Sequence, residues 1–321
     1  MRPPSAPWPP PFGRATAAAP APGSTGPPPT RRSVPATARR HGEPPFPRPA
    51  SRSVYTGPMK ILPGTAVFLT GASSGIGREI ALELAGRGCR IALLARRRNV
   101  LEDVAGLVEE RGGESLVLPA DVRDAAAVER AVQEALARFG RLEIAIPNAG
   151  LGRYALAAEH DPAEVEELFR VNVLGTTNTV HAVLPHLLDN PPAHIAAIAS
   201  SAGLIPHRLA SAYCATKAAV IQSLAAVRLE VHDRGVGVSW VCPGAVDTPF
   251  FDGARLDPET DLPLLARLFV RTLRASEVAR ATVRAIERNR REVTLPPFVR
   301  FFAASRRLTP TLADWINRKL P

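Results

Sequence analysis

The chain has 321 residues, a formal net charge of +10 and three cysteines, Cys89, Cys214 and Cys242. An odd number of widely spaced cysteines argues against a disulfide framework and against a metal site built from cysteine. No run of about 18 apolar residues occurs, so we expect no transmembrane helix and assign the protein to the cytoplasm. The net charge alone would suit a nucleic-acid-binding protein.

Residues 1–58 differ in composition from the rest of the chain. They carry eight arginines and one acid, a net +7, and 17 of the 33 prolines, whereas the other 263 residues carry +3. Such a segment cannot bury enough apolar surface to offset its chain entropy, so we predict that it is disordered. Its prolines prevent the amphipathic helix of a mitochondrial import signal. Because Met59 lies where the composition changes, we hypothesise that translation starts there; a disordered or targeting tail is the alternative.

From residue 59 to residue 297, short apolar runs alternate with segments of helical periodicity. The runs are apolar throughout, as in strands that are buried on both faces. The predicted strands are Thr65–Thr70, Arg90–Ala95, Ser115–Leu118, Leu142–Pro147, His194–Ala199, Val236–Val241 and Glu292–Leu295. The predicted helices are Glu79–Gly86, Val100–Glu110, Ala125–Phe139, Pro162–Leu188 and Ser211–Val231. This alternation predicts an α/β fold: a Rossmann-type doubly wound parallel sheet in a single three-layer α/β/α domain.

The first predicted strand runs into a glycine-rich turn, and a helix follows it. Glycines let the backbone approach a pyrophosphate closely, and the N-terminus of the helix offers free N–H groups to its negative charge. A glycine cluster alone is weak evidence, but here the strand and the helix are both in place. The residues predicted to bind a dinucleotide at this turn are Thr70, Gly71, Ser73, Ser74, Gly75, Ile76 and Gly77.

The end of the second predicted strand indicates which dinucleotide is bound. An acid at this place binds the ribose hydroxyls of NAD, but the sequence reads Ala95-Arg96-Arg97-Arg98. Arginine suits the 2′-phosphate of NADP through its bidentate fork. A solvated arginine run is the alternative, although cations at the start of a helix oppose its dipole. We therefore expect NADP(H) in preference to NAD(H), with Arg96 as the main phosphate ligand.

Tyrosine and lysine are both scarce, yet one of each occurs four residues apart in a predicted helix. The chain has three tyrosines and 37 arginines but only three lysines, and Tyr213 and Lys217 share one helix face. A nearby cation favours the phenolate and lowers the pKa of a tyrosine, which suits a general acid–base. The alternative is a surface lysine whose aliphatic stem covers apolar surface. It does not explain the use of lysine in a chain that otherwise uses arginine.

In its motifs and their order, the segment Lys60–Pro297 resembles the short-chain dehydrogenase/reductase family. The glycine-rich turn and the Tyr213–Lys217 pair resemble the cofactor loop and the catalytic pair of that family. The resemblance implies further cofactor contacts from Asp121 and Val122, from the turn Asn148-Ala149-Gly150, and from Pro243, Gly244, Val246 and Thr248. One departure is Pro147, where relatives usually carry a second asparagine; we expect it to affect local hydrogen bonding more than chemistry.

The resemblance also implies a mechanism and names the residues that carry it. Ser200 lies thirteen residues before Tyr213, as the catalytic serine of the family does, and Ser201 is the competing candidate. Tyr213 would exchange the proton with a carbonyl or alcohol oxygen that Ser200 also binds. Lys217 would lower the pKa of Tyr213 and bind the ribose, and Asn172 would hold a water that links Lys217 to solvent. The cofactor would carry the hydride.

Several properties remain expectations. The substrate is a small carbonyl or alcohol compound, and apolar residues at Leu151–Tyr154, Ser201–His207 and after Thr248 suggest an apolar one. Members of the family are usually homodimers or homotetramers, and we expect no metal and no nucleic acid. A nucleotide-binding scaffold on the same fold is the alternative function. The tail 298–321 mixes aromatic and basic residues; packing against the domain or a second subunit is favoured over contact with a membrane surface.

Overall fold

The computed structural model describes residues 57–248, 250 and 272–311. The chain divides into two units, Met1–Arg48 and Pro49–Pro321, and the first lies wholly outside the described residues. Of the segment 1–58 that is predicted to be disordered, residues 1–56 lie outside the described part. The apolar residues between 251 and 271 also lie outside it. Met59 is described, and its side chain is 4% exposed and packs in the core of the second unit.

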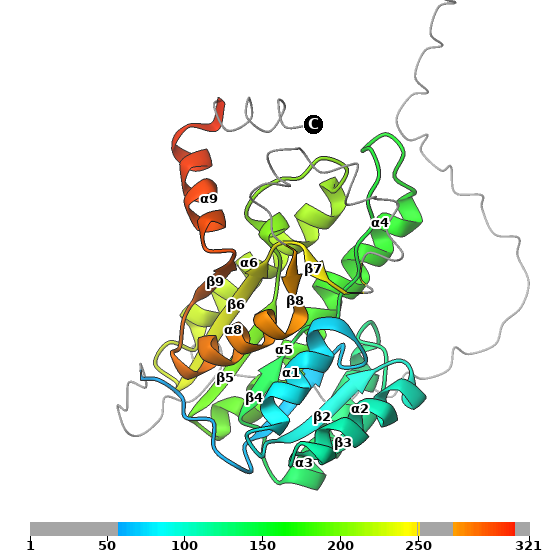
Figure 1. The fold of residues 1–321 in the computed structure, drawn as a ribbon, viewed down its shortest axis with the longest axis vertical. Helices are drawn as coiled ribbons and strands as arrows, with labels where there is room; N and C mark the ends of the chain where they lie inside the picture. Colours follow the sequence, from blue (N-terminus) through cyan, green and yellow to red (C-terminus); the bar gives the residue numbers. More distant parts are fainter. Residues whose placement is uncertain (1–56, 249, 251–271, 312–321) are drawn as a thin grey trace, which may run out of the picture. The chain divides into compact units, whose positions relative to one another are not determined.

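A seven-stranded parallel sheet forms the centre of this unit, as the sequence predicts (Figure 1). The strand order is β3-β2-β1-β4-β5-β6-β9. The strands are β1 (Ala66–Thr70), β2 (Arg90–Ala95), β3 (Glu114–Pro119), β4 (Ile144–Ile146), β5 (Ala193–Ile198), β6 (Val236–Pro243) and β9 (Glu292–Leu295). A second, two-stranded sheet pairs β7 (Val246–Asp247) with β8 (Leu273–Arg274). The sequence did not predict this pair, because strands of two residues show no periodicity.

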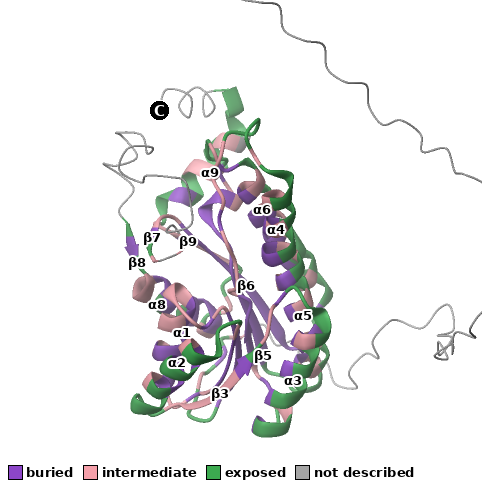
Figure 2. Ribbon diagram, turned by 90° about the vertical axis from the view of Figure 1, so that its right-hand side faces the viewer, coloured by how far each residue is buried: buried purple, intermediate pink, exposed green. Residues whose placement is uncertain are grey.

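Helices cover both faces of the sheet (Figure 2). One layer contains α1 (Gly75–Ala85), α2 (Arg98–Glu110) and α8 (Ala275–Glu287), and the other contains α3 (Ala125–Phe139), α5 (Gly175–Asp189) and α6 (Ser211–Glu230). Helix α8 was not predicted. Its buried side combines Val278, Val283 and Ile286 with three alanines and a threonine, and it packs closely against α1.

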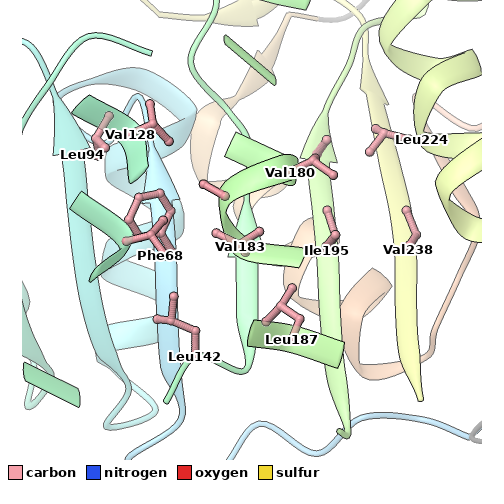
Figure 3. Close-up of a cluster of buried hydrophobic side chains, with 14 of the residues drawn as sticks. Phe68, Leu94, Val128, Leu142, Val180, Val183, Leu187, Ile195, Leu224 and Val238 are labelled. Carbon is pink, nitrogen blue, oxygen red and sulfur yellow. The ribbon is translucent and has the colours of Figure 1, made fainter. Parts of the chain in front are cut away.

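The two larger apolar clusters of the core lie one on each face of the sheet. Along β1, Ala66 and Phe68 point into one cluster, and Val67 and Leu69 point into the other. Figure 3 shows the first cluster, in which Phe68 lies among side chains from α3, α5 and the neighbouring strands. Burial on both faces explains why these strands read as continuous apolar runs rather than as alternating ones.

The long helix predicted for Pro162–Leu188 is present, but the sequence did not predict that the type of helix changes along it. It is divided into α4 (Pro162–Leu168), a π-helical segment η1 (Phe169–Leu174) and α5. Asp161 begins α4 by accepting a hydrogen bond from the N–H of Ala163, and Pro162 occupies the first turn. Single turns of π-helix often occur at functional sites, and this one carries Asn172.

The strand order reverses between β1 and β4, which are neighbours although two strands separate them in the chain. The chain leaves β1 toward one face of the sheet, through α1, and leaves β4 toward the other face, through α4 and α5. In open α/β sheets the ligand binds at this point. The loop after β1 carries the glycine-rich motif, and the loop after β4 carries Asn148-Ala149-Gly150.

Candidate active site

The glycine-rich turn after β1 adopts a conformation that its glycines make possible. Gly71 and Gly75 have positive φ angles of 66° and 53°. A Cβ atom on Gly77 would lie 2.1 Å from the carbonyl oxygen of Gly71, so no larger residue fits where the turn meets α1. The backbone is thus folded tightly and leaves the N-terminus of α1 open to a ligand.

Hydrogen bonds from the loop after β4 hold this turn in place. The hydroxyl oxygen of Thr70 accepts bonds from the N–H groups of Asn148 (3.0 Å) and Ala149 (3.1 Å). The side-chain amide of Asn148 donates to the carbonyl oxygens of Thr70 (3.0 Å) and Gly71 (3.1 Å). In this structure the side chains of Thr70 and Asn148 therefore hold the glycine-rich turn and the loop after β4 together. A ligand would contact the residues next to them. Pro147, the departure from the family pattern, accepts a bond from the N–H of Ile198 at 2.9 Å.

A cavity of about 460 Å³ adjoins the turn. Its lining includes Ser73, Ser74 and Gly75 from the turn and residues from the start of α8. The methyl group of Thr248 lies 3.1 Å from the position that a Cβ on Gly75 would occupy, so Thr248 closes the other side of the turn. Arg78 and Arg274 also line the cavity, as do the carboxylates of Glu79 and Asp247. The serine hydroxyls, the arginines and the helix N-terminus suit a pyrophosphate, whereas the two carboxylates oppose its charge.

The predicted adenosine side of the site lies at the ends of β2 and β3. Arg96 is exposed, and its charge acts on Asp121. The guanidinium of Arg123 donates hydrogen bonds to both carboxylate oxygens of Asp121, and the shortest of them is 2.7 Å long. Burial alone would raise the pKa of Asp121, but the hydrogen bonds and charge of Arg123 outweigh it and lower the pKa. Arg123 was not predicted from the sequence; its position two residues after Asp121 lets both its N–H and its guanidinium bond to that carboxylate.

The four predicted catalytic residues come together from three elements. Tyr213 and Lys217 lie on α6, Ser200 follows β5, and Asn172 lies in η1; their exposures are 6%, 5%, 8% and 0%. The hydroxyl groups of Ser200 and Tyr213 share a hydrogen bond. The Nζ atom of Lys217 lies 5.8 Å from the centre of the Tyr213 ring and donates to the carbonyl oxygen of Ile198 at 3.3 Å.

The structure corrects one expectation about this group, the direction of the pKa shift of Tyr213. Burial raises the pKa of Tyr213 to about 12, against an opposing effect of the bond with Ser200. Burial also lowers the pKa of Lys217 to about 8. The expected lowering of the Tyr213 pKa by Lys217 is thus absent, because the ammonium group is turned toward Ile198 and desolvation dominates both residues. Both shifts favour the neutral forms of the two side chains.

Thr216, which the sequence analysis did not select, connects the group. Its hydroxyl donates to the carbonyl oxygen of Tyr213 (2.8 Å) and accepts from the side-chain amide of Asn172 (3.0 Å). Asn172 is held further by Leu151, whose N–H donates to Oδ1 (2.9 Å) and whose carbonyl accepts from Nδ2 (3.0 Å). Gly150 lies between Asn172 and Lys217, since a Cβ there would be 3.1 Å from Oδ1 and 3.4 Å from Nζ.

The two candidate serines have different surroundings. The hydroxyl of Ser200 bonds to Tyr213 and also accepts from the N–H of Ala202 at 3.1 Å, which fixes its direction. Ser201 begins a short 3₁₀ turn, and its carbonyl oxygen accepts from the N–H groups of Leu204 and Ile205. The geometry therefore brings Ser200 to Tyr213, whereas the contacts of Ser201 with the turn are made by its backbone.

Apolar and aromatic side chains surround the ring of Tyr213. The rings of Tyr154 and Phe250 lie 5.8 and 5.9 Å from it, centre to centre, and Leu168 and Ala202 pack in the same cluster. A substrate that reaches the hydroxyl of Tyr213 must therefore pass a largely apolar surface. The apolar residues predicted beyond Thr248 lie, apart from Phe250, outside the described residues.

The remaining predicted contacts lie at the ends of β6 and β7 and along the first turn after β3. The N–H of Gly244, next to Pro243, donates to the carbonyl oxygen of Leu295 at 2.7 Å, and Val246 is 5% exposed. Val122 packs against Gly175 of α5. Among the described residues, no cluster of acids, histidines or cysteines could hold a metal ion, and no helix is long and apolar enough to cross a membrane.

Comparison with known proteins gives consistent matches. The family model for short chain dehydrogenases matches residues 65–259. The ketoacyl reductase HetN of Nostoc sp. is 31% identical over 266 residues, which cover 81% of this chain and 90% of that protein. An alcohol dehydrogenase of Thermococcus sibiricus, solved with 5-hydroxy-NADP, is 29% identical, with a TM-score of 0.63 over 72% of this chain and 95% of its own. A short chain dehydrogenase/reductase of Burkholderia phymatum, solved with NAD, is 27% identical. Its TM-score is 0.71, and the match covers 79% of this chain and 96% of that protein.

Proposed function

Because the chain belongs to the short-chain dehydrogenase family of oxidoreductases, we propose that it interconverts a carbonyl compound and a secondary alcohol with NADP(H). The observation that carries the proposal is the meeting of Asn172, Ser200, Tyr213 and Lys217 at the carboxyl edge of the sheet. Four buried polar side chains in one place cost stability, since each must be desolvated. A nucleotide-binding scaffold, the alternative function, has no need to maintain all of them.

In this proposal the bound cofactor supplies or accepts a hydride at its nicotinamide. Tyr213 donates the proton to the carbonyl oxygen in reduction, and its raised pKa keeps that proton in place at neutral pH. Ser200, already bonded to the hydroxyl of Tyr213, holds the same oxygen. Lys217 reaches the ribose hydroxyls, and Asn172 keeps the backbone next to Gly150 in position for the cofactor.

The preference for NADP(H) is supported by the end of β2, where Arg96 is exposed and no acid is available to bind a ribose. The solved relatives include one with an NADP derivative and one with NAD, so the family itself does not decide between them. The apolar cluster around Tyr213 supports an apolar substrate. We further propose that the protein is a cytoplasmic homodimer or homotetramer, which the two helices α5 and α6 would join.

The replacement Tyr213→Phe tests the reaction. It keeps the ring but removes the proton donor, so turnover should fall by roughly 10²–10⁴-fold while the affinity for NADPH stays unchanged. A panel of ketones and alcohols, followed by NADPH absorbance with NADH as comparison, first identifies a substrate. Fluorescence titration of NADPH then measures binding to the variant. Turnover close to that of the wild type would contradict the assignment of Tyr213.

A matched pair of serine variants separates the two candidates. Ser200→Ala removes the hydroxyl bonded to Tyr213, so turnover should fall by roughly a hundredfold, whereas Ser201→Ala should retain it. Both serines are 8% exposed, so the two variants lose similar buried surface. The reverse result would transfer the role to Ser201.

A further inference from the structure

The C-terminal helix α9 (Phe298–Leu308) begins at the carboxyl edge of the sheet. It follows β9, whose last residue Leu295 pairs with Pro243 at the end of β6, and it extends away from the sheet (Figure 1). Within the part of the chain that the structure describes, one side of α9 rests on the domain: Val299 is 6% exposed, while Phe302 and Ala303 are partly buried. The favoured sequence interpretation, packing against the domain or a second subunit, predicts that the other aromatic residues would also be covered.

The structure leaves a second, apolar side of α9 exposed. Phe301 is 77% exposed, Leu308 is 84% exposed and Phe298 is 43% exposed. These three residues lie at i, i+3 and i+10, which places them on one side of a helix. Val299, two residues before Phe301, lies on the nearly opposite side. The helix is therefore apolar where it meets the domain and again where it meets solvent.

The charge of this segment is of one sign. Residues 298–311 contain Arg300, Arg306 and Arg307 and no acid, and Arg300 is exposed. Residues 312–321, outside the described part, add Arg318 and Lys319 against Asp314, together with Trp315. An exposed aromatic and aliphatic side with adjoining arginines complements a surface that is apolar inside and negatively charged outside.

We propose that α9 lies on the surface of an anionic membrane, with Phe301 and Leu308 inserted among the lipids and Arg300 at the headgroups. A second copy of the chain would cover the apolar side equally well, but it would not use the one-signed charge. Binding through α9 would fix the orientation of the protein relative to the membrane. Because α9 begins at the edge where Tyr213 lies, the bound protein turns its active-site edge toward a source of apolar compounds. The lipid contact itself does not depend on the proposed reaction.

Co-sedimentation of the full chain with lipid vesicles tests this proposal. The vesicles consist of phosphatidylcholine alone or of phosphatidylcholine mixed with phosphatidylserine. The wild type should sediment with the mixed vesicles and much less with the neutral ones, and added salt should release it. Failure of the wild type to bind the mixed vesicles would overturn the proposal.

Variants locate the contact. The double variant Phe301→Ser/Leu308→Ser should weaken binding by at least roughly tenfold, and Arg300→Glu by roughly fivefold or more. The matched controls are Leu62→Ser, at a leucine before β1 that is 58% exposed, and Arg130→Glu, at an exposed arginine of α3; both should bind as the wild type does. Circular dichroism shows whether each variant is folded. Unchanged binding of the folded double variant would overturn the proposal.

The mass of the protein in solution distinguishes a lipid surface from a second copy. Light scattering without lipid should give the same mass for the wild type and for the double variant, because α9 is not used between subunits. A smaller mass for the double variant would assign the apolar side to a subunit contact and overturn the proposal. This readout needs no substrate, so a failure of the proposed reaction would not affect it.

Discussion

Among single residues, Thr216 has the most connected position in the active site. Its hydroxyl group is fully buried and joins the carbonyl oxygen of Tyr213 to the amide of Asn172. It touches neither of the atoms that would react, so its role is to position other groups. A buried donor that loses its partner costs about 1–3 kcal/mol, which the surrounding structure can avoid only by moving. Without the threonine hydroxyl, Asn172 and the first turn of α6 would no longer be held together.

We predict that Thr216→Val lowers kcat by roughly tenfold with little change in the KM for NADPH, because Asn172 loses one hydrogen-bond partner. Thr216→Ser keeps the hydroxyl and should restore kcat. The matched control is Thr282→Val, since Thr282 is also fully buried and donates to a carbonyl of its own helix, that of Val278, at 2.9 Å. Steady-state kinetics of the three variants measure the effect. Equal losses in Thr216→Val and Thr282→Val would indicate a general loss of stability instead.

Among the elements, the strands of the parallel sheet bring distant motifs to one edge. The loop after β1 carries the glycine-rich turn, the end of β2 carries Arg96, and β5 ends next to Ser200. The π-helical segment between α4 and α5 adds Asn172 from the side. Each element supplies one part of the site, so a change at one of them should affect one part of the reaction.

A change at the end of β2 should affect the binding of the cofactor phosphate alone. Arg96→Ala should raise the KM for NADPH by roughly 10–100-fold, since a hydrogen bond between charged groups contributes about 1.5–3 kcal/mol, and should leave the KM for NADH unchanged. Arg130→Ala, at an exposed arginine of α3, is the control for the loss of one positive charge. Kinetics with the two cofactors at saturating substrate measure both values. A parallel loss for NADH would show that Arg96 does not bind the 2′-phosphate.

At the scale of the whole molecule, stability depends on a histidine in the middle of the sheet. His194 in β5 is 1% exposed, and its Nε2 atom lies 2.7 Å from the hydroxyl of Ser239. A Cβ on Gly237 would lie 2.2 Å from Nδ1 of His194, so the neighbouring strand leaves just enough room for the ring. Burial, followed by the charge of Arg228, lowers the pKa of His194 to about 3.

This pKa predicts that the protein loses stability as the pH falls below about 6.5, the value in an unfolded chain. Between pH 6.5 and about 3 the unfolded state binds a proton at this residue and the folded state does not. Each pH unit in that range should therefore lower the free energy of unfolding by about 1.4 kcal/mol. Urea unfolding at several pH values measures the slope. His194→Gln should flatten it, and His232→Gln, at an exposed histidine, should not.

Much of the fold could be predicted from the sequence because it depends on local patterns. The strand β2, the helix α3 and the strand β9 have the predicted limits, since a continuous apolar run or a 3.6-residue repeat is visible within a few residues. The glycine-rich turn and the pair Tyr213 and Lys217 were visible for the same reason, because their spacing is set by one turn or one helix face.

Tertiary structure decided the features that depend on contacts between distant segments. The hydrogen bond between Thr216 and Asn172 joins residues 44 positions apart, and the π-helical segment η1 within the long helix accompanies the bonds of Asn172 to Leu151. The direction of the pKa shift of Tyr213 was predicted wrongly, because the sequence shows the neighbouring lysine but not how deeply both side chains are buried. The sequence likewise shows that α9 is apolar and basic; only its packing shows which of its sides is left open.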